Sequence, residues 1–213
     1  MSAAATGPLL HPTNEPNRGF HLNGSAQSGK TLTLLTAGSF WGGGPDGYIR
    51  SWRATANGLE GIACAHNDGF LPLDELGQVS AREAGQIGYM LANGVGKTRS
   101  GRNGIAPPVL HWRLVFMSSG EIGLADKMAE IGQRTHAGLE VRMIDVPANA
   151  GADHGVFEHL HGCADGATFA KGLKTAVFRY YGAAVRHYVE LVSRIWKQEG
   201  DEFPAKLHEY CES

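Results

Sequence analysis

The stretch Gly24-Ser25-Ala26-Gln27-Ser28-Gly29-Lys30-Thr31 decides the fold predicted for this chain. It matches the pattern glycine, four residues of any type, glycine, lysine, threonine. A short apolar run, residues 19–23, precedes it, and residues 31–37 continue without a glycine or a proline. The predicted order is therefore strand, loop and helix, which is the context that the pattern requires. We interpret the stretch as the phosphate loop of a P-loop NTPase that binds ATP with Mg²⁺.

The residue types in this loop suit phosphate chemistry. Glycines let backbone N–H groups turn inward around phosphates, and the start of the following helix adds partial positive charge. Lys30 is predicted to reach the terminal phosphates, and the Thr31 hydroxyl to ligate magnesium. The alternative is a chance glycine-lysine turn that opens a helix. The predicted nucleotide-binding residues are Gly24, Ser25, Ala26, Gln27, Ser28, Gly29, Lys30 and Thr31.

An acidic pair follows the apolar run 69–73. Hydrolysis needs a carboxylate near the metal and a group that orients water, both at the end of a neighbouring strand. Asp74 is predicted to hold the magnesium shell, and Glu75 to polarise the attacking water. The alternative is an acidic helix cap. Pro72 cannot donate to a ladder, so this strand must bulge or leave that position unpaired.

Further catalytic candidates lie after the strongest strand, residues 111–117. Ser118 and Ser119 are predicted to sense the terminal phosphate or to position water, with a simple turn as the alternative. Arg134 and Arg142 lie where ring-forming ATPases supply an arginine to the nucleotide of the adjacent subunit. A structural salt bridge is an equal alternative for each arginine.

Strand-like and helix-like segments alternate along the chain. The fold class predicted is α/β: a three-layer P-loop NTPase with a mostly parallel sheet, RecA-like or AAA+-like, plus a C-terminal helical pair. Asn57 with Glu60 suggests a capping box for one of the helices. Residues 1–17 are expected to form a flexible arm, 18–150 the ATPase core and 151–213 a C-terminal loop and helical extension. The strands expected are 19–23, 48–52, 69–73, 111–117 and 139–146.

Composition places the chain among ordinary soluble proteins. It has 213 residues, 42% hydrophobic and 19% charged, and no apolar run approaches the ~20 residues of a membrane span. Three scattered cysteines predict neither a disulfide framework nor a zinc ribbon, so a cytoplasmic location is expected. The net charge of -2 argues against a protein that coats nucleic acid by bulk electrostatics.

The distribution of charge is more informative than its total. No acidic residue occurs between Glu83 and Glu121, whereas Lys97, Arg99 and Arg102 do. A basic hairpin here is predicted to grip DNA, in single-stranded form and independently of sequence, inside a homo-oligomeric ring. A solvated charged loop is the alternative.

Several segments resemble a bacterial and phage family of helicase-like P-loop ATPases that is classed as a domain of unknown function. Its members occur beside primase modules in phage, plasmid and mobile-element replication proteins. The resemblance covers residues 18–162. The segments that carry it are YIRSWRATANGLE (48–60), LDELGQ (73–78), AG (84–85), YMLANG (89–94), WRL (112–114), SGE (119–121) and EVR (140–142).

The resemblance implies ATP-driven work on DNA by a helicase-like motor domain. Members of the family carry further sequence upstream, so we expect a truncated or standalone module with a primase or upstream domain as partner. One alternative is a small P-loop kinase that places a phosphoryl acceptor with Arg50 or Arg53. Another is a nucleotide-binding assembly module without helicase activity.

Overall fold

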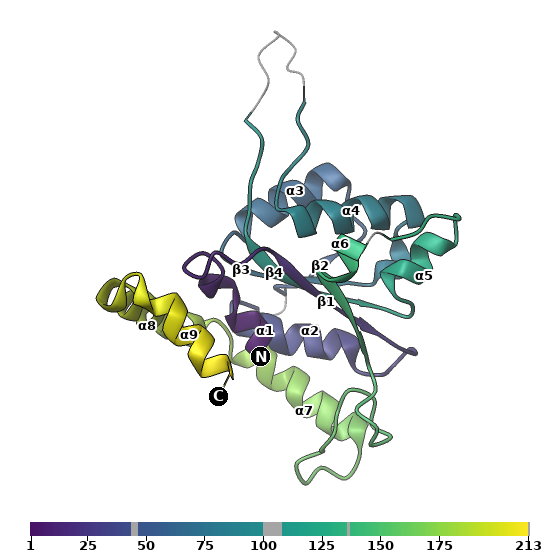
Figure 1. Ribbon diagram of the computed structural model, residues 1–213. Coiled ribbons are helices and arrows are strands. Elements are labelled where there is room, and N and C mark those ends of the chain that lie inside the picture. The colour runs from purple at the N-terminus through teal and green to yellow at the C-terminus, as the bar shows by residue number, and fades with distance from the viewer. Residues whose placement is uncertain (44–46, 100–107, 136, 213) are drawn as a thin grey trace.

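A parallel sheet of five strands forms the centre of the molecule (Figure 1). The computed structural model describes residues 1–43, 47–99, 108–135 and 137–212. The strand order is β2-β3-β4-β1-β5, so β1, which leads into the glycine-rich loop, lies between β4 and β5. The strands are β1 (Arg18–Asn23), β2 (Arg50–Ser51), β3 (Gly69–Asp74), β4 (Leu114–Gly120) and β5 (Met143–Pro147).

Helices cover both faces of this sheet and make three layers (Figure 1). One face carries α3 (Ala56–Ala65), α4 (Ala81–Asn93), α5 (Leu124–Ala129) and α6 (Ala137–Glu140). The other carries α1 (Ser2–Ala5), η1 (Gly7–Leu9), α2 (Lys30–Ser39) and α7 (Gly166–Arg179). The short η2 (Leu76–Gln78) follows β3, and α8 (Ala183–Glu199) and α9 (Glu202–Glu212) lie to one side. The predicted α/β class with a parallel, helix-covered sheet is confirmed.

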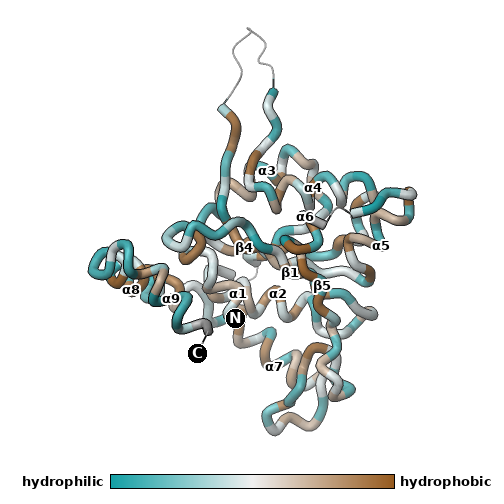
Figure 2. The backbone as a smooth tube through the Cα atoms, viewed as in Figure 1, coloured by the Kyte–Doolittle hydropathy of each residue, from teal (hydrophilic) through white to brown (hydrophobic). Residues whose placement is uncertain are grey.

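The core explains why the central strands are continuous apolar runs. Every residue of β4 is buried, and Figure 2 shows hydrophobic segments on the strands and on the helices that cover them. Phe116 belongs to the apolar cluster under α3 and α4, while its neighbour Val115 belongs to the cluster under α1 and α2. Alternate side chains thus fill two cores, as expected for a parallel sheet covered on both faces.

Pro72 lies inside β3, which pairs with β4 in regular register at this position and has no strand on its other side there. The two-residue β2 pairs only with Leu73 and Asp74, so β3 up to Pro72 has β4 as its one neighbouring strand. On that side of β3, the hydroxyl of Tyr48, which precedes β2, donates to the Phe70 carbonyl at 3.0 Å. The proline is tolerated because the second edge of β3 is open at its position.

Two local predictions were wrong. The strand expected over 139–146 begins only at Met143, because α6 occupies residues 137–140. Helix α3 is capped by Thr55, whose hydroxyl accepts from the Gly58 N–H, rather than by a capping box at Asn57 and Glu60. Glu60 is buried instead.

A capping box does occur one helix later, at the start of α4. There the Ser80 hydroxyl accepts from the Glu83 N–H, and the Glu83 carboxylate accepts from the Ser80 N–H. Both partners of this box are exposed, so it fixes the start of the helix without using buried space.

The first seventeen residues pack on the sheet, in contrast to the flexible arm that was expected. Ala4 and Leu10 are buried, and the Trp41 indole N–H donates to the Ala4 carbonyl at 2.6 Å. Asn17 donates to the Leu91 carbonyl and accepts from the Leu114 N–H. The contacts come from small and amide residues, which carry no periodic hydrophobic signal.

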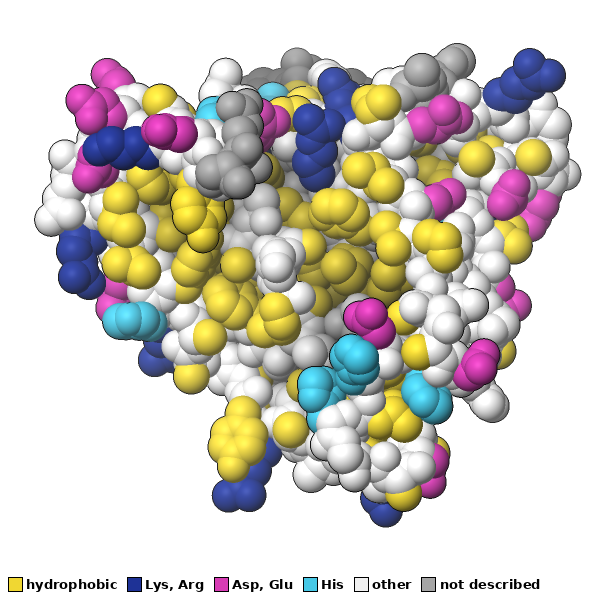
Figure 3. Space-filling view, turned by 60° about the horizontal axis from the view of Figure 1, so that its bottom comes forward, with side chains coloured by type: hydrophobic (Ala, Val, Ile, Leu, Met, Phe, Trp, Pro, Cys, Tyr) yellow, Lys and Arg dark blue, Asp and Glu magenta, His cyan; other side chains and the backbone are white. Residues whose placement is uncertain are grey.

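The predicted helical pair corresponds to α7 and α8, and α9 follows as a third helix. Figure 3 views this side of the molecule, where hydrophobic side chains gather in a broad hollow. Tyr180, Tyr181 and Trp196 are among the exposed large hydrophobic residues of these helices and their connection. None of the helices in the described ranges combines the length and the apolar character needed to cross a bilayer.

Candidate functional site

The glycine-rich loop joins the end of β1 to the first turn of α2. Gly29 has φ 93°, and a side chain there would meet Val156 at 2.7 Å. Gly24 has φ 158°, and its missing side chain leaves room for Ala148 at 3.1 Å. Both glycines of the motif are therefore needed because the segment after β5 packs closely against this loop.

Lys30 is buried within the loop that precedes it, with 7% of its surface exposed. Its ammonium donates to the carbonyls of Gly24 at 2.8 Å and Ser25 at 2.7 Å. The Lys30 ammonium thus links the start of the loop to the first residue of α2. It is placed at the head of α2, where partial positive charge of the helix adds to its own.

The side chains of Thr31, Asp74 and Ser119 meet at the ends of α2, β3 and β4. The Thr31 hydroxyl lies 3.2 Å from both carboxylate oxygens of Asp74. The Ser119 hydroxyl donates to Asp74 Oδ1 at 2.5 Å and accepts from the Glu75 N–H at 3.1 Å. Three elements far apart in sequence therefore converge on one carboxylate.

Glu75 directly follows β3 in a left-handed conformation, with φ 64° and ψ 76°. This conformation is uncommon for a residue with a side chain and separates the direction of Glu75 from that of Asp74. The Glu75 N–H donates to the Ser119 hydroxyl, while the half-buried Glu75 carboxylate makes no hydrogen bond or ion pair within the described part of the chain. Adjacent carboxylates thus have different surroundings.

Ser118 is placed differently from Ser119. Its hydroxyl is fully buried and accepts from the Trp52 indole N–H at 2.8 Å. It also lies 2.8 Å from His21 Nδ1, and His21 Nε2 lies 2.9 Å from the Ile122 carbonyl. Because a carbonyl only accepts, Nε2 carries a proton, and Ser118 donates to Nδ1. The structure brings Ser119, and not Ser118, to Asp74.

His21 is a functional candidate that the sequence motifs did not indicate. It lies at the centre of β1, and burial lowers its pKa, which favours the neutral ring that the hydrogen bonds require. Hydrogen bonds thus run from Trp52 to Ser118, to His21 and to Ile122. They connect the segment after β2 with β4, β1 and the segment after β4. A histidine inside an apolar strand close to a glycine-rich loop is the signal that could have found it.

A cavity of about 520 Å³ opens beside the loop. One wall is residues 23–28, and the other is formed by Pro147, Ala148, Asn149, Asp153 and Gly155. The cavity adjoins the end of β1, which is where ligands bind in open α/β sheets.

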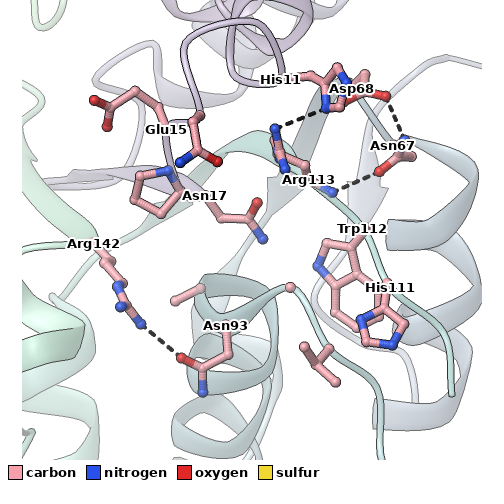
Figure 4. Close-up of a pocket in the computed structure, with 15 residues that line it drawn as sticks. His11, Glu15, Asn17, Asn67, Asp68, Asn93, His111, Trp112, Arg113 and Arg142 are labelled. Atoms are coloured by element: carbon pink, nitrogen blue, oxygen red, sulfur yellow. Dashed lines mark hydrogen bonds between the residues drawn. The ribbon is translucent and has the colours of Figure 1, made fainter.

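The two candidate arginine fingers lie away from this cavity. Arg142 precedes β5 and donates to the Asn93 side chain at 2.9 Å. It lines a cavity of about 710 Å³ at the edge where the strands begin, together with Arg113 and Trp112 (Figure 4). Arg134 is exposed after α5. Neither arginine forms a hydrogen bond with residues 24–31 in the described part of the chain.

The basic segment between α4 and β4 starts as a hairpin that rises past α3 and α4 (Figure 1). An antiparallel bridge joins Val95 to His111. The Arg99 guanidinium donates at 2.7 Å to Glu60, whose side chain is 1% exposed, and at 2.7 Å to Asn57. Lys97 is exposed, and only its backbone bonds to Glu60. The third predicted DNA contact, Arg102, lies outside the described residues.

Comparison with solved structures supports the fold. The structure described as "SCCmec type IV Cch - active helicase" matches with a TM-score of 0.66 and 24% sequence identity. The match covers 97% of this chain and 34% of that one, so the chain spans about a third of the helicase. NtrX from Brucella abortus in complex with ADP matches with a TM-score of 0.38 and 15% identity, over 84% and 48% of the two chains.

Comparison by sequence gives a family. No curated protein matches the chain. A family model described as "Domain of unknown function (DUF927)" matches residues 1–109, which is just over half of the 213 residues. The chain therefore belongs to the DUF927 family.

Proposed function

We propose that this protein is a P-loop ATPase whose residues 24–31 bind the phosphates of ATP-Mg and whose hydrolysis of ATP drives a helicase-like, DNA-associated motor. RecA-like or AAA+-like architecture is part of the proposal, as are residues 18–150 as the ATPase core. The strand order supports it, because β4, which carries Ser119, lies between β1 with its loop and β3, whose end carries Asp74 and Glu75.

One observation carries the proposal: the Thr31 hydroxyl lies 3.2 Å from both oxygens of Asp74. Thr31 lies in the first turn of α2 and Asp74 at the end of β3, and the two residues are 43 positions apart in sequence. Nothing in a chance glycine-lysine turn requires that meeting. A shared magnesium ion does require it, because the loop threonine and a strand-end aspartate are its usual protein partners.

The donor set fits magnesium. Mg²⁺ takes hard oxygen ligands and is usually bound through one or two carboxylates together with substrate phosphates and waters. Thr31 and Asp74 offer a hydroxyl and a carboxylate, and would hold the ion between the loop and β3. Bound there, it would neutralise charge on the terminal phosphates and draw electrons from the bond that breaks.

The protein groups around it have separate roles. Lys30 leaves the Gly24 and Ser25 carbonyls to bind phosphate oxygens, and the backbone N–H groups of the loop share that charge. Glu75 takes a proton from the attacking water, and Ser119 fixes both acids by bonding to the Asp74 carboxylate and the Glu75 N–H. Ser119 therefore takes the sensor role, with Ser118 supporting it from the core.

The proposal also includes binding of single-stranded DNA and assembly into a ring. Lys97 on the projecting hairpin, with Arg102 further along the chain, would contact phosphates of single-stranded DNA. Arg134 or Arg142 would reach the nucleotide of an adjacent subunit in a homo-oligomeric ring. We also propose a primase or an upstream domain as partner, since members of the helicase-like family that the sequence resembles occur beside primase modules.

Replacement Glu75→Gln tests the chemistry. We expect ATP affinity within about threefold of wild type and hydrolysis slower by roughly 10²–10⁴-fold, because the base is lost while the binding groups remain. Equilibrium ATP binding and phosphate release measure the two effects.

Glu190→Gln, at an exposed position of α8, is the control and should leave both values unchanged. A wild-type protein that binds ATP but releases no phosphate would contradict the ATPase proposal and favour an assembly module. Transfer of phosphate to a small acceptor would favour a kinase using Arg50 or Arg53.

A further inference from the structure

The cavity beside the glycine-rich loop has two chemically different walls. Residues 24–28 form the first wall, and α2 begins two residues after it, at Lys30. The second wall is the segment after β5, which includes Pro147, Asn149 and Asp153. Asp153 is exposed and lines the cavity, and its carboxylate has no hydrogen bond or ion pair with any residue that the structure describes.

The second wall is anchored to the first at both of its ends. At the near end, the Ala148 N–H donates to the Asn23 carbonyl at 2.6 Å. At the far end, the Val156 N–H donates to the Ser28 carbonyl at 2.9 Å. Gly155 lies so close to the Ser28 backbone that a side chain there would collide with it. The two walls therefore form one site of fixed width.

The second wall also holds its own shape. The Ala150 N–H donates to the Gly155 carbonyl at 2.7 Å, which closes residues 150–155 into a loop. The Asn149 side-chain oxygen accepts from the Gly151 N–H at 2.8 Å, so its amide N–H₂ remains to donate. Asp153 stands in the closed loop with φ 57°. Its place opposite residues 24–28 follows from backbone bonds.

The charges of the walls determine how a nucleotide can lie between them. Phosphates are drawn to the glycine-rich loop by its N–H groups, and Lys30 and the start of α2, which follow the first wall in the chain, add positive charge. A carboxylate repels phosphates and accepts hydrogen bonds, so it suits the hydroxyl groups of a sugar or the amino group of a base. Pro147 and Ala148 add apolar surface beside it.

We propose that the second wall is the nucleoside subsite: the ribose and base lie against residues 147–155, and Asp153 accepts hydrogen bonds from the ribose hydroxyls. This rests on the proposed binding of phosphates by residues 24–31. It makes the protein selective for a ribonucleotide, since a sugar without hydroxyls leaves the carboxylate unpartnered.

Titration with ADP, 2′,3′-dideoxy-ADP and pyrophosphate tests the subsite in the presence of magnesium. Asp153→Asn should weaken ADP binding about tenfold or more, because a hydrogen bond to a charged group is lost. Pyrophosphate affinity should be unchanged. Wild type should bind dideoxy-ADP more weakly than ADP by a similar factor, and Asp153→Asn should weaken dideoxy-ADP no further.

Asp201→Asn, at an exposed position between α8 and α9, is the matched control and should bind all three probes as wild type does. Equal weakening of ADP and pyrophosphate by Asp153→Asn would overturn the subsite, as would unchanged ADP affinity. Failure of wild type to bind both ADP and pyrophosphate would overturn the phosphate site as well. A lost subsite and a lost phosphate site thus give different results.

Discussion

At the scale of single residues, the buried His21 connects the sheet to the candidate site. Its two ring nitrogens bond to Ser118 and to the Ile122 carbonyl, and only a neutral ring can accept from the Ser118 hydroxyl. Ser118 precedes Ser119, which holds Asp74. Protonation of His21 would therefore disturb the strand that supports the acidic pair.

His21 predicts a dependence of stability on pH. Burial lowers its pKa below the usual 6.5, so the unfolded chain binds the proton more readily than the folded chain. The free energy of unfolding should fall as pH drops from 6.5 to the folded-state pKa, and level off below it. Each unit of lowered pKa contributes about 1.4 kcal/mol to this change.

Urea unfolding at about pH 7.5 and about pH 5.5 measures the effect. His21→Asn should unfold more easily than wild type at the higher pH and show a smaller difference between the two pH values. His66, whose pKa burial also lowers, contributes a change of the same sign, so His66→Asn is the comparison. An unchanged pH difference in His21→Asn would contradict the assignment.

Two residues that the sequence motifs indicated are neighbours in the structure, and their roles stay proposals. Thr31 and Asp74 were singled out from their patterns, and their side chains meet in the structure. The choice between Ser118 and Ser119 needed the sheet, because alternate residues of β4 point to opposite sides. His21 carried no motif, and its bonds come from Ser118 and Ile122, about a hundred residues later in the chain.

At the scale of elements, the basic hairpin divides its charges between structure and surface. Arg99 pairs with Glu60, whose carboxylate is buried on α3, while the Lys97 side chain is exposed. Loss of a partner leaves a buried acid with less compensation, which is costly. The two residues should therefore respond differently to substitution, although both are basic and only two positions apart.

Arg99→Ala should lower the free energy of unfolding by about 1–3 kcal/mol, reduced toward the lower value because the guanidinium is partly exposed. Lys97→Ala should leave stability within about 0.5 kcal/mol of wild type. It should weaken single-stranded DNA binding and lower the salt slope by about one.

Urea unfolding and DNA titrations at several salt concentrations measure both effects. Lys171→Ala, at an exposed position of α7, is the control for loss of one positive charge. Equal destabilisation by Lys97→Ala and Arg99→Ala would contradict the division of roles. A salt slope unchanged in Lys97→Ala would remove Lys97 from the DNA contacts.

Element-scale prediction was sound for strands and weaker for their ends. The central strands β3 and β4 follow from runs of apolar residues, since a sheet covered on both faces needs them, whereas β2 and most of β5 are exposed. The ends were shifted, as when residues 139–142 joined α6 and its turn, because tertiary packing of Leu139 under α4 overrides the apolar pattern. The N-terminal packing depends on Gly7 and Asn17, which no periodicity marks.

At the scale of the whole molecule, the two candidate arginines lie away from the glycine-rich loop. Arg142 lies at the edge where strands begin, and the glycine-rich loop lies at the opposite edge. The proposed head-to-tail ring would have to place one of these arginines beside the glycine-rich loop of the adjacent subunit. An arginine from one subunit could then stabilise charge on the nucleotide of the next.

Mixing experiments test this arrangement. Arg134→Ala and Arg142→Ala should each keep ATP affinity, and the one that acts between subunits should lower hydrolysis by roughly 10³-fold or more. Doping that variant into wild type should reduce activity by more than its share of the mixture. Activity that falls in strict proportion for both variants would contradict transfer of an arginine between subunits.

The central claim is that residues 24–31 bind ATP, whose hydrolysis drives a motor that acts on DNA. ATP hydrolysis by wild type and by Lys30→Ala, each with and without single-stranded DNA, tests it most directly, with Lys171→Ala as the control. We predict that DNA stimulates the wild-type and control proteins, and that Lys30→Ala loses both basal and stimulated hydrolysis because the terminal phosphates lose their ammonium partner. Hydrolysis that persists in Lys30→Ala, or that DNA leaves unchanged in wild type, would contradict the account.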